Sequence, residues 1–202
     1  MGVPMVTSEV ARQAKGRERR RAIIEAAAAI IREEGPNAVT HRAVAARAGC
    51  SLSATTYYFS GLDELLAEAG TLNIRRWAGR AEAVADSIEA GDVPRTRDQA
   101  IEAILRACLP KDTPLPTHYQ QLLAVGTSSP ITAAYRAGRR RLDQAVGRVL
   151  EHTGCALPPE LVIAVVDGAA VTAISEHRDV RETARALLDE LIGERWSPPV
   201  VG

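Results

Sequence analysis

Apolar residues recur along this chain at intervals of three and four positions, and no stretch shows the strict alternation typical of a half-buried strand. The first clear helical stripe lies in residues 17–34, and Gly35-Pro36 ends that helix. Its apolar positions are Ile23, Ile24, Ala27, Ile30 and Ile31. The same pattern predicts longer helices over residues 62–90, 97–109, 117–125, 131–153, 159–177 and 180–192. We therefore expect an all-α fold.

Between the first two of these helices, residues 40–59 predict a short helix, a tight turn and a second short helix. Thr40 can cap the first helix, and Gly49 can end it in the left-handed conformation. Ser51 or Ser53 can cap the second helix. Two short helices joined by a turn of small residues are typical of the helix-turn-helix motif, whose second helix enters the major groove of DNA. The alternative is an ordinary helical hairpin whose three consecutive aromatic residues pack in its core.

The second short helix combines small side chains with hydroxyl groups. Small side chains let the helix backbone approach base edges, and threonine and tyrosine hydroxyls can reach phosphate oxygens. We expect Thr55 to contact a base and Tyr57 to contact a phosphate. The candidate DNA-binding residues are Thr40, His41, Arg42, Ser51, Ser53, Thr55, Thr56, Tyr57 and Tyr58.

The formal net charge is zero, but the charges are unevenly distributed along the chain. Residues 1–60 hold nine basic and five acidic groups, whereas residues 61–202 hold 16 basic and 20 acidic groups. A positive N-terminal part on a negative remainder is expected when only one end of a molecule meets phosphate. Six of the nine basic residues precede Ala22, so we expect a basic arm that adds sequence-independent affinity through counterion release. The alternative is a merely solvated tail.

The motif in residues 35–66 resembles the N-terminal region of the tetracycline-repressor (TetR) family of bacterial transcription regulators. The matching residues are Gly35, Thr40, Arg42, Val44, Ala45, Ala48, Gly49, Ser51, Tyr57, Phe59, Glu64, Leu65 and Leu66. Two departures from the family pattern stand out. Tyr58 replaces the histidine that often precedes Phe59, and Thr56 replaces the first tyrosine of the same motif. Gly61-Leu62 replaces a Ser-Lys pair whose lysine commonly contacts phosphate in relatives.

This resemblance implies a three-helix DNA-binding domain over residues 1–60 and a larger helical effector-binding and dimerisation domain over residues 61–202. It implies a TetR-like regulator, namely a homodimeric repressor that a small-molecule effector releases from a palindromic operator in double-stranded DNA. The alternative is a degenerate relative that acts as a ligand receptor or partner protein without specific DNA binding. The missing lysine before residue 63 keeps that alternative open.

Two apolar helix faces near the C-terminus are candidates for the dimer interface. Gly168 and its alanine neighbours permit close helix approach, and the resemblance implies a four-helix bundle formed by two helices from each subunit. The candidate interface residues are Val165, Val166, Ala169, Ala173, Leu187, Leu188 and Leu191. The alternative is that these faces form the core of a single subunit.

A mostly aliphatic helical domain with a few polar or aromatic groups can enclose a small molecule. The candidate effector-binding residues are Trp77, Tyr119 and Tyr135, and ordinary core packing is the alternative for Trp77.

No catalytic or cofactor-binding motif is present in the sequence. It contains no Gly-rich phosphate loop, no His-Glu-x-x-His and no Gly-x-Ser-x-Gly, and its four histidines show no metal-ligand spacing. We therefore expect neither an enzyme nor a metal site nor a cofactor. No apolar run approaches the roughly 18 residues that span a bilayer, and the N-terminus lacks a secretory signal. With three scattered cysteines, these features predict a cytoplasmic protein without a membrane partner.

Overall fold

Helices account for all the regular structure in residues 5–111, 113–193 and 196–198, which are the residues that the computed structural model describes. Within them the fold is all-α, as the sequence predicts. Two short 3-10 helices are η1 (Pro36–Ala38) and η2 (Val125–Thr127). The α-helices are α1 (Met5–Glu33), α2 (His41–Arg47), α3 (Leu52–Tyr58), α4 (Leu62–Glu89), α5 (Arg97–Cys108), α6 (Leu115–Ala124), α7 (Ser129–His152), α8 (Pro159–Ser175) and α9 (Val180–Ile192).

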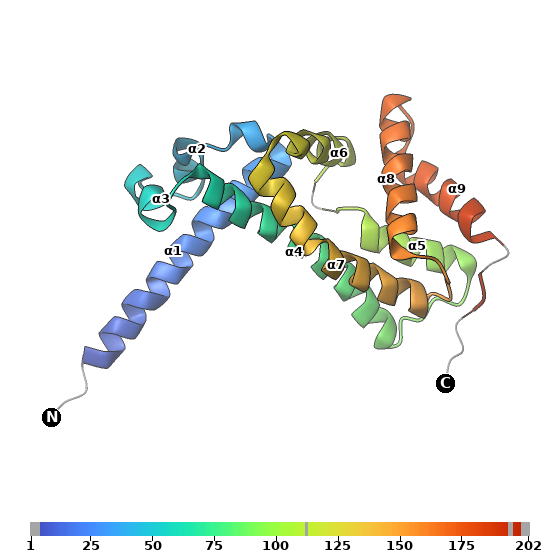
Figure 1. Ribbon diagram of the computed structural model, residues 1–202. Coiled ribbons are helices and arrows are strands. Elements are labelled where there is room, and N and C mark those ends of the chain that lie inside the picture. The colour runs from blue at the N-terminus through green and yellow to red at the C-terminus, as the bar shows by residue number, and fades with distance from the viewer. Residues whose placement is uncertain (1–4, 112, 194–195, 199–202) are drawn as a thin grey trace.

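Helix α1 begins about three turns earlier than the apolar pattern predicts, at Met5 instead of residue 17. Residues 9–15 are exposed and, apart from Val10, polar or small, so they carry no apolar stripe that would reveal a helix. The expected basic arm is therefore the first half of α1, which projects from the rest of the molecule (Figure 1).

The second half of α1 packs with α2, α3 and the start of α4 around one hydrophobic core, which we call the head core. It contains Ile23 and Ile31 from α1 and Phe59 from the end of α3, each at most 2% exposed. Leu65 from α4 and Ile131 from α7 also belong to it. The core thus continues past residue 60, and the division of the chain at that position stays a prediction.

Helices α4 and α7 lie side by side along most of their lengths and join the head to the body (Figure 1). Their close approach depends on two glycines. A Cβ atom at Gly138 would lie 2.5 Å from Cγ2 of Ile74, and one at Gly70 would lie 3.1 Å from Cγ2 of Ile131. The absence of side chains at these two positions lets the helices pack backbone to side chain.

A second core, the body core, lies among α5, α8, α9 and the C-terminal parts of α4 and α7. Four of the predicted interface residues belong to it: Val166, Ala169, Ala173 and Leu188 are each 0% exposed within one subunit. This burial agrees with the alternative that the sequence left open, in which these faces form the core of a single subunit. Helix α8 is apolar on more than one side, so periodicity alone did not separate its inward face from its outward face.

Two prolines explain why α6 and α7 begin earlier than predicted. Pro116 and Pro130 lie in the first turns of these helices, where a proline removes only an N–H that has no partner in the helix. The prolines thus belong to the helices and not to the loops before them.

Candidate nucleic-acid interface and ligand cavity

Helix α3 lies at the outer edge of the head (Figure 1), and most of its residues are exposed. The side chain of Tyr57 is 82% exposed and that of Leu52 is 49% exposed, both large values for such side chains. Ser53 and Thr56 are exposed as well. An aromatic hydroxyl and small polar groups therefore share one outward surface on a helix at the tip of the molecule.

Side-chain caps hold the two short helices in place. The Thr40 hydroxyl accepts a hydrogen bond of 3.1 Å from the Ala43 N–H at the start of α2, and the Ser51 hydroxyl accepts one of 3.2 Å from the Ala54 N–H at the start of α3. Gly49 takes the left-handed conformation, with φ of 60°, in the turn between them. The sequence predicts the Thr40 cap and the Gly49 turn, and of its two candidates for the second cap, Ser51 and Ser53, the structure uses Ser51.

Thr55 corrects our assignment of a base-contacting residue. Its side chain is 0% exposed and its hydroxyl donates to the Leu52 carbonyl at 2.7 Å. The Thr55 Oγ1 also lies 3.1 Å from Nδ1 of His41. Thr55 therefore joins α3 to α2, because its position on a seven-residue helix faces the other helices and not solvent.

A groove between α1 and α3 contains a basic residue that the sequence did not single out. Arg19 lies in it beside Ser53 and Tyr57, and one of its terminal nitrogens donates to the Gly49 carbonyl at 3.3 Å. Tyr58 is half-buried, and a Cβ atom at Gly16 would lie 3.6 Å from its hydroxyl. Tyr58 is thus placed against α1, whereas its neighbour Tyr57 faces solvent.

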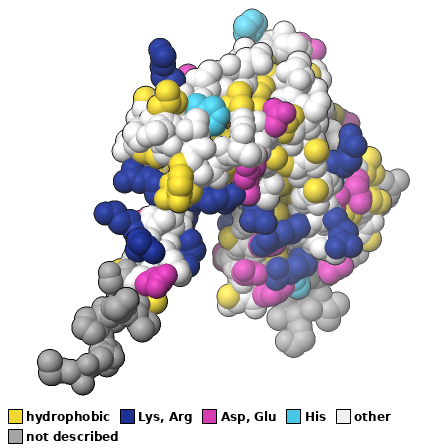
Figure 2. Space-filling model, turned by 60° about the vertical axis from the view of Figure 1, so that its left-hand side comes forward, with side chains coloured by type: hydrophobic (Ala, Val, Ile, Leu, Met, Phe, Trp, Pro, Cys, Tyr) yellow, Lys and Arg dark blue, Asp and Glu magenta, His cyan; other side chains and the backbone are white. Residues whose placement is uncertain are grey.

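The basic residues of the first 21 positions have different roles in the structure. Arg20 forms an ion pair of 2.8 Å with Glu68 of α4, and its guanidinium lies 5.0 Å from the ring centroid of Phe59. Arg17 and Arg21 are exposed instead, like Arg12 and Lys15. Figure 2 shows Lys and Arg side chains along the projecting helix and around the head. A cationic surface therefore adjoins the outward side of α3.

The start of α4 shows what stands in place of the missing Ser-Lys pair. Gly61 is the N-cap residue and provides no side-chain hydrogen bond. Glu64 accepts instead from the backbone N–H and the hydroxyl of Ser60, at 2.7 and 2.8 Å. The N–H bond from Ser60 holds the pKa of Glu64 below its ordinary value. The helix start is capped, and the cation beside it is Arg20 of α1, 3.9 Å from Glu64, instead of a lysine on α4 itself.

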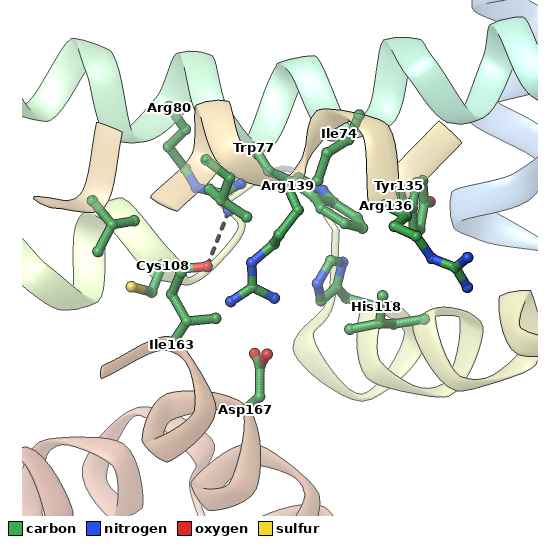
Figure 3. Close-up of a pocket in the computed structure, with 13 residues that line it drawn as sticks. Ile74, Trp77, Arg80, Cys108, His118, Tyr135, Arg136, Arg139, Ile163 and Asp167 are labelled. Atoms are coloured by element: carbon green, nitrogen blue, oxygen red, sulfur yellow. Dashed lines mark hydrogen bonds between the residues drawn. The ribbon is translucent and has the colours of Figure 1, made fainter. Parts of the chain in front are cut away.

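The body contains a cavity of about 310 Å³ that residues of α4, α5, α6, α7 and α8 line (Figure 3). Trp77 and Tyr135, both predicted from the sequence, form part of its wall, with ring centroids 4.9 Å apart. His118 extends this aromatic wall, 5.6 Å from Trp77. Burial raises the pKa of Tyr135 to about 12, against the opposing effects of Asn73 and Arg32.

Tyr119, the third predicted residue, is 2% exposed and lies behind the cavity wall. Its hydroxyl donates to Oδ1 of Asp167, which does line the cavity, at 3.0 Å. Burial raises the pKa of Asp167, while this hydrogen bond and the charge of Arg139 act to lower it and favour the ionised carboxylate. Tyr119 therefore acts on the cavity through Asp167.

Three arginines also line the cavity, and the sequence analysis missed them because arginines on helices are usually solvated. Arg80 donates to the carbonyls of Ala107 and Cys108 at the end of α5, at 3.1 and 3.0 Å. The Nε of Arg139 donates to Asp143 at 2.6 Å, and its terminal nitrogens point into the cavity (Figure 3). Arg136 points away from Asp167.

A buried polar residue links this cavity to the head. Asn73 is 0% exposed and lies on α4 next to Ile74, which lines the cavity. Its carboxamide donates to the Ala28 carbonyl of α1 at 3.3 Å and accepts from Arg32 at 2.8 Å. Helix α1 is thus fastened to α4 within one residue of the cavity wall.

The outward faces of α8 and α9 carry apolar side chains. Leu161, Val171 and Leu187 are 42%, 44% and 40% exposed. Val165 and Leu191, both predicted interface residues, are half-buried in a groove between the two helices. Of the predicted interface residues, Leu187 is thus exposed and Val165 and Leu191 are half-buried, whereas Leu161 and Val171 are exposed but were not among them.

Within the part of the chain that the structure describes, no group of three or more His, Cys, Asp or Glu side chains is placed to hold a metal ion. No helix there is long and apolar enough to cross a membrane.

Residues 23–69, which run from the second half of α1 into α4, match the sequence model of the bacterial regulatory proteins of the tetR family. No curated protein is similar enough in sequence to count as a relative.

Solved structures of the same fold span nearly the whole chain. The multidrug binding protein EbrR, complexed with imidazole, is 24% identical over 91% of this chain and 97% of its own, with a TM-score of 0.59. A putative transcriptional regulator from Saccharomonospora viridis, in complex with choline, is 20% identical over 88% of this chain and 96% of its own, with a TM-score of 0.64. A putative TetR-family regulator from Mesorhizobium loti is 15% identical over 88% of this chain and 96% of its own, with a TM-score of 0.63. At these identities the likeness concerns the fold.

Proposed function

We propose, from the match of residues 23–69 to the tetR-family model and from the helical fold, that the chain is a tetR-family protein that acts as a homodimeric transcriptional repressor. A small molecule that binds in the body releases it from operator DNA, and it acts in the cytoplasm. The observation that carries the proposal is the capped, outward-facing α3 within the matched residues, with Tyr57 exposed beside a cationic α1. This combination supports DNA docking rather than an enzymatic role.

DNA contact in this proposal combines two kinds of residue. The exposed side of α3, with Ser53, Thr56 and Tyr57, enters the major groove. Thr40, His41, Arg42 and Ser51 approach the adjoining phosphates from the starts of α2 and α3. The exposed basic residues of α1, with Arg19 in the groove, add affinity that does not depend on sequence: Arg12, Lys15, Arg17 and Arg21.

Dimerisation in this proposal uses the outward faces of α8 and α9, with Val165, Leu187 and Leu191 retained from the prediction and Leu161 and Val171 added. Contiguous exposed apolar surface is typical of a protein–protein interface. A two-fold dimer would present two α3 helices to half-sites one helical turn (~34 Å) apart. A single head has one seven-residue α3 and would contact one half-site, so the second half-site needs the head of a partner subunit.

Effector release rests on the cavity and its connection to the head. EbrR has been solved with imidazole and with ethidium, and the Saccharomonospora viridis protein with choline, so proteins of this fold accept small organic molecules. In this chain a ligand displaces Ile74 and Trp77 of α4, and Asn73 carries the displacement to α1. The ligand acts only through its different affinities for the two head arrangements, and about 1–3 kcal/mol is typical of such coupling.

The test is DNA binding by the full-length protein to the region upstream of its own gene, measured by fluorescence anisotropy at rising salt concentration. We expect affinity for that region to exceed affinity for unrelated DNA and to fall steeply with salt, because phosphate contacts release counterions. Arg42→Gln, at the exposed start of α2, should weaken binding, whereas Arg141→Gln on the body should not. A chain without preference for any genomic fragment would refute the proposal.

One observation favours a second function, that of a ligand receptor without specific DNA binding. The N-terminus of α4 has Gly61 and Leu62 where relatives commonly carry a phosphate-contacting lysine, and Glu64 places a carboxylate there. Ligand binding in the body without affinity for any DNA fragment would support this alternative.

A further inference from the structure

The cavity holds two opposite charges that face each other without pairing. Figure 3 shows the guanidinium of Arg139 and the carboxylate of Asp167 pointing toward one another from α7 and α8. Among the described carboxylates, Arg139 forms an ion pair with Asp143 and not with Asp167. Burial raises the pKa of Asp167, and the charge of Arg139 across the cavity opposes that rise.

Each of the two groups is held on its own side of the cavity. Asp143, only 16% exposed, fixes Arg139 through Nε at 2.6 Å, which leaves the two terminal nitrogens directed inward. Tyr119, buried behind the wall, donates to one oxygen of Asp167 at 3.0 Å and leaves its other oxygen available to a ligand. The two anchors keep a hydrogen-bond donor and an acceptor apart in a fixed arrangement, which lowers the ordering cost of binding.

The aromatic residues of the cavity wall favour an aromatic ligand. Trp77, Tyr135 and His118 meet edge to face, with neighbouring ring centroids 4.9 and 5.6 Å apart. Such rings favour a flat unsaturated group packed among them. The cavity volume of about 310 Å³ lies at the lower end of small-molecule sites, so the ligand is small.

On this basis, and resting on the proposed function, we propose that the effector is a small aromatic compound with a zwitterionic head group. Its anionic group binds the terminal nitrogens of Arg139, and its cationic group binds Asp167. A ligand with one charge would satisfy one wall and face a like charge on the other, and like charges in contact are unfavourable. Both bonds of the zwitterion are charge-assisted, so both walls contribute to affinity.

The test uses three probes with the same ring, namely L-tryptophan, tryptamine and indole-3-propionate. Tryptamine lacks the carboxylate of tryptophan and indole-3-propionate lacks its ammonium group. Binding to the full-length protein without DNA is measured by isothermal titration calorimetry. We expect L-tryptophan to bind about tenfold or more tightly than either single-charge probe, because a charge-assisted hydrogen bond contributes at least that factor.

Two variants assign each charge to its wall. Asp167→Asn keeps an acceptor for Tyr119, and we expect it to weaken L-tryptophan and tryptamine about tenfold while indole-3-propionate binds as well or better. Arg139→Gln should weaken L-tryptophan and indole-3-propionate and spare tryptamine. The matched controls are Glu82→Gln and Arg141→Gln, since that ion pair lies on α4 and α7 outside the cavity. We expect no change in either control.

Three outcomes would overturn the inference: a single-charge probe that binds as tightly as L-tryptophan, affinities that do not respond to either cavity variant, or no binding by any of the three probes. None of these outcomes bears on the proposed repressor function, because DNA binding is measured in a separate experiment. Conversely, a chain that binds L-tryptophan as described and never binds DNA would refute the repressor function and leave the ligand class intact.

Discussion

The contact between Gly138 of α7 and Ile74 of α4 provides a sharp test of how the two long helices are held together. A Cβ atom at position 138 would lie 2.5 Å from Cγ2, 2.8 Å from Cγ1 and 3.2 Å from Cβ of Ile74. Ile74 is 3% exposed and β-branched, so its side chain has few alternative rotamers. Gly138→Ala therefore requires the helices to separate or Ile74 to move into the cavity.

Two opposing effects determine the result. Replacing a mid-helix glycine by alanine stabilises a helix by roughly 0.5–1 kcal/mol. Forcing an extra methyl group into a packed contact destabilises by about 1–3 kcal/mol. We expect Gly138→Ala to lower the free energy of unfolding by about 1–2 kcal/mol. Gly79 of α4 is the matched control because a Cβ atom there meets nothing within 4 Å, so Gly79→Ala should be stabilising.

The assay is thermal unfolding followed by circular dichroism at equal protein concentrations, since a dimer's stability depends on concentration. A difference of about 1–3 kcal/mol between the variants corresponds to a Tm difference of about 2–12 °C for a chain of this length. Combining Gly138→Ala with Ile74→Ala should destabilise less than the sum of the single changes. If Gly138→Ala is as stable as Gly79→Ala, the helix contact is not as close as described.

Three further predictions concern the DNA-binding surface, the dimer and the coupling between sites. Tyr57→Phe should weaken binding to all DNA sequences about equally in anisotropy titrations. Thr55→Val should leave the sequence preference unchanged. It should lower the free energy of unfolding by about 1–3 kcal/mol, because Thr55 is buried and its hydroxyl lies beside His41. Leu187→Lys should yield monomers in size-exclusion chromatography with light scattering. Leu123→Lys, at a leucine on α6 that is more exposed (67% against 40%), should remain dimeric. A dimeric Leu187→Lys would exclude the proposed interface. Asn73→Leu should bind the effector with near-normal affinity by calorimetry, but the effector should no longer lower its affinity for DNA. If the effector still lowers DNA affinity as in the unaltered protein, the coupling does not pass through Asn73.

The positions of the helices followed from the sequence wherever an apolar stripe met a clear end signal. Helix α9 was predicted with the bounds that the structure shows, and α4 and α5 with their last residues off by one. The start of α1 was missed because an exposed helix that packs against nothing leaves no apolar stripe. The starts of α6 and α7 were missed because proline was taken as an interruption and not as a first-turn residue.

What the sequence determined by itself is local: the all-α class, the cap at Thr40, and the left-handed turn at Gly49. Each depends on hydrogen bonds or dihedral angles within about four residues, which the order of residues specifies directly. Tertiary structure alone decided that Thr55 faces inward and that Asp167 and Arg139 line one cavity with their charged groups pointing toward each other. Those outcomes depend on which helices pack together and at what rotation, and residues far apart in sequence specify that packing jointly.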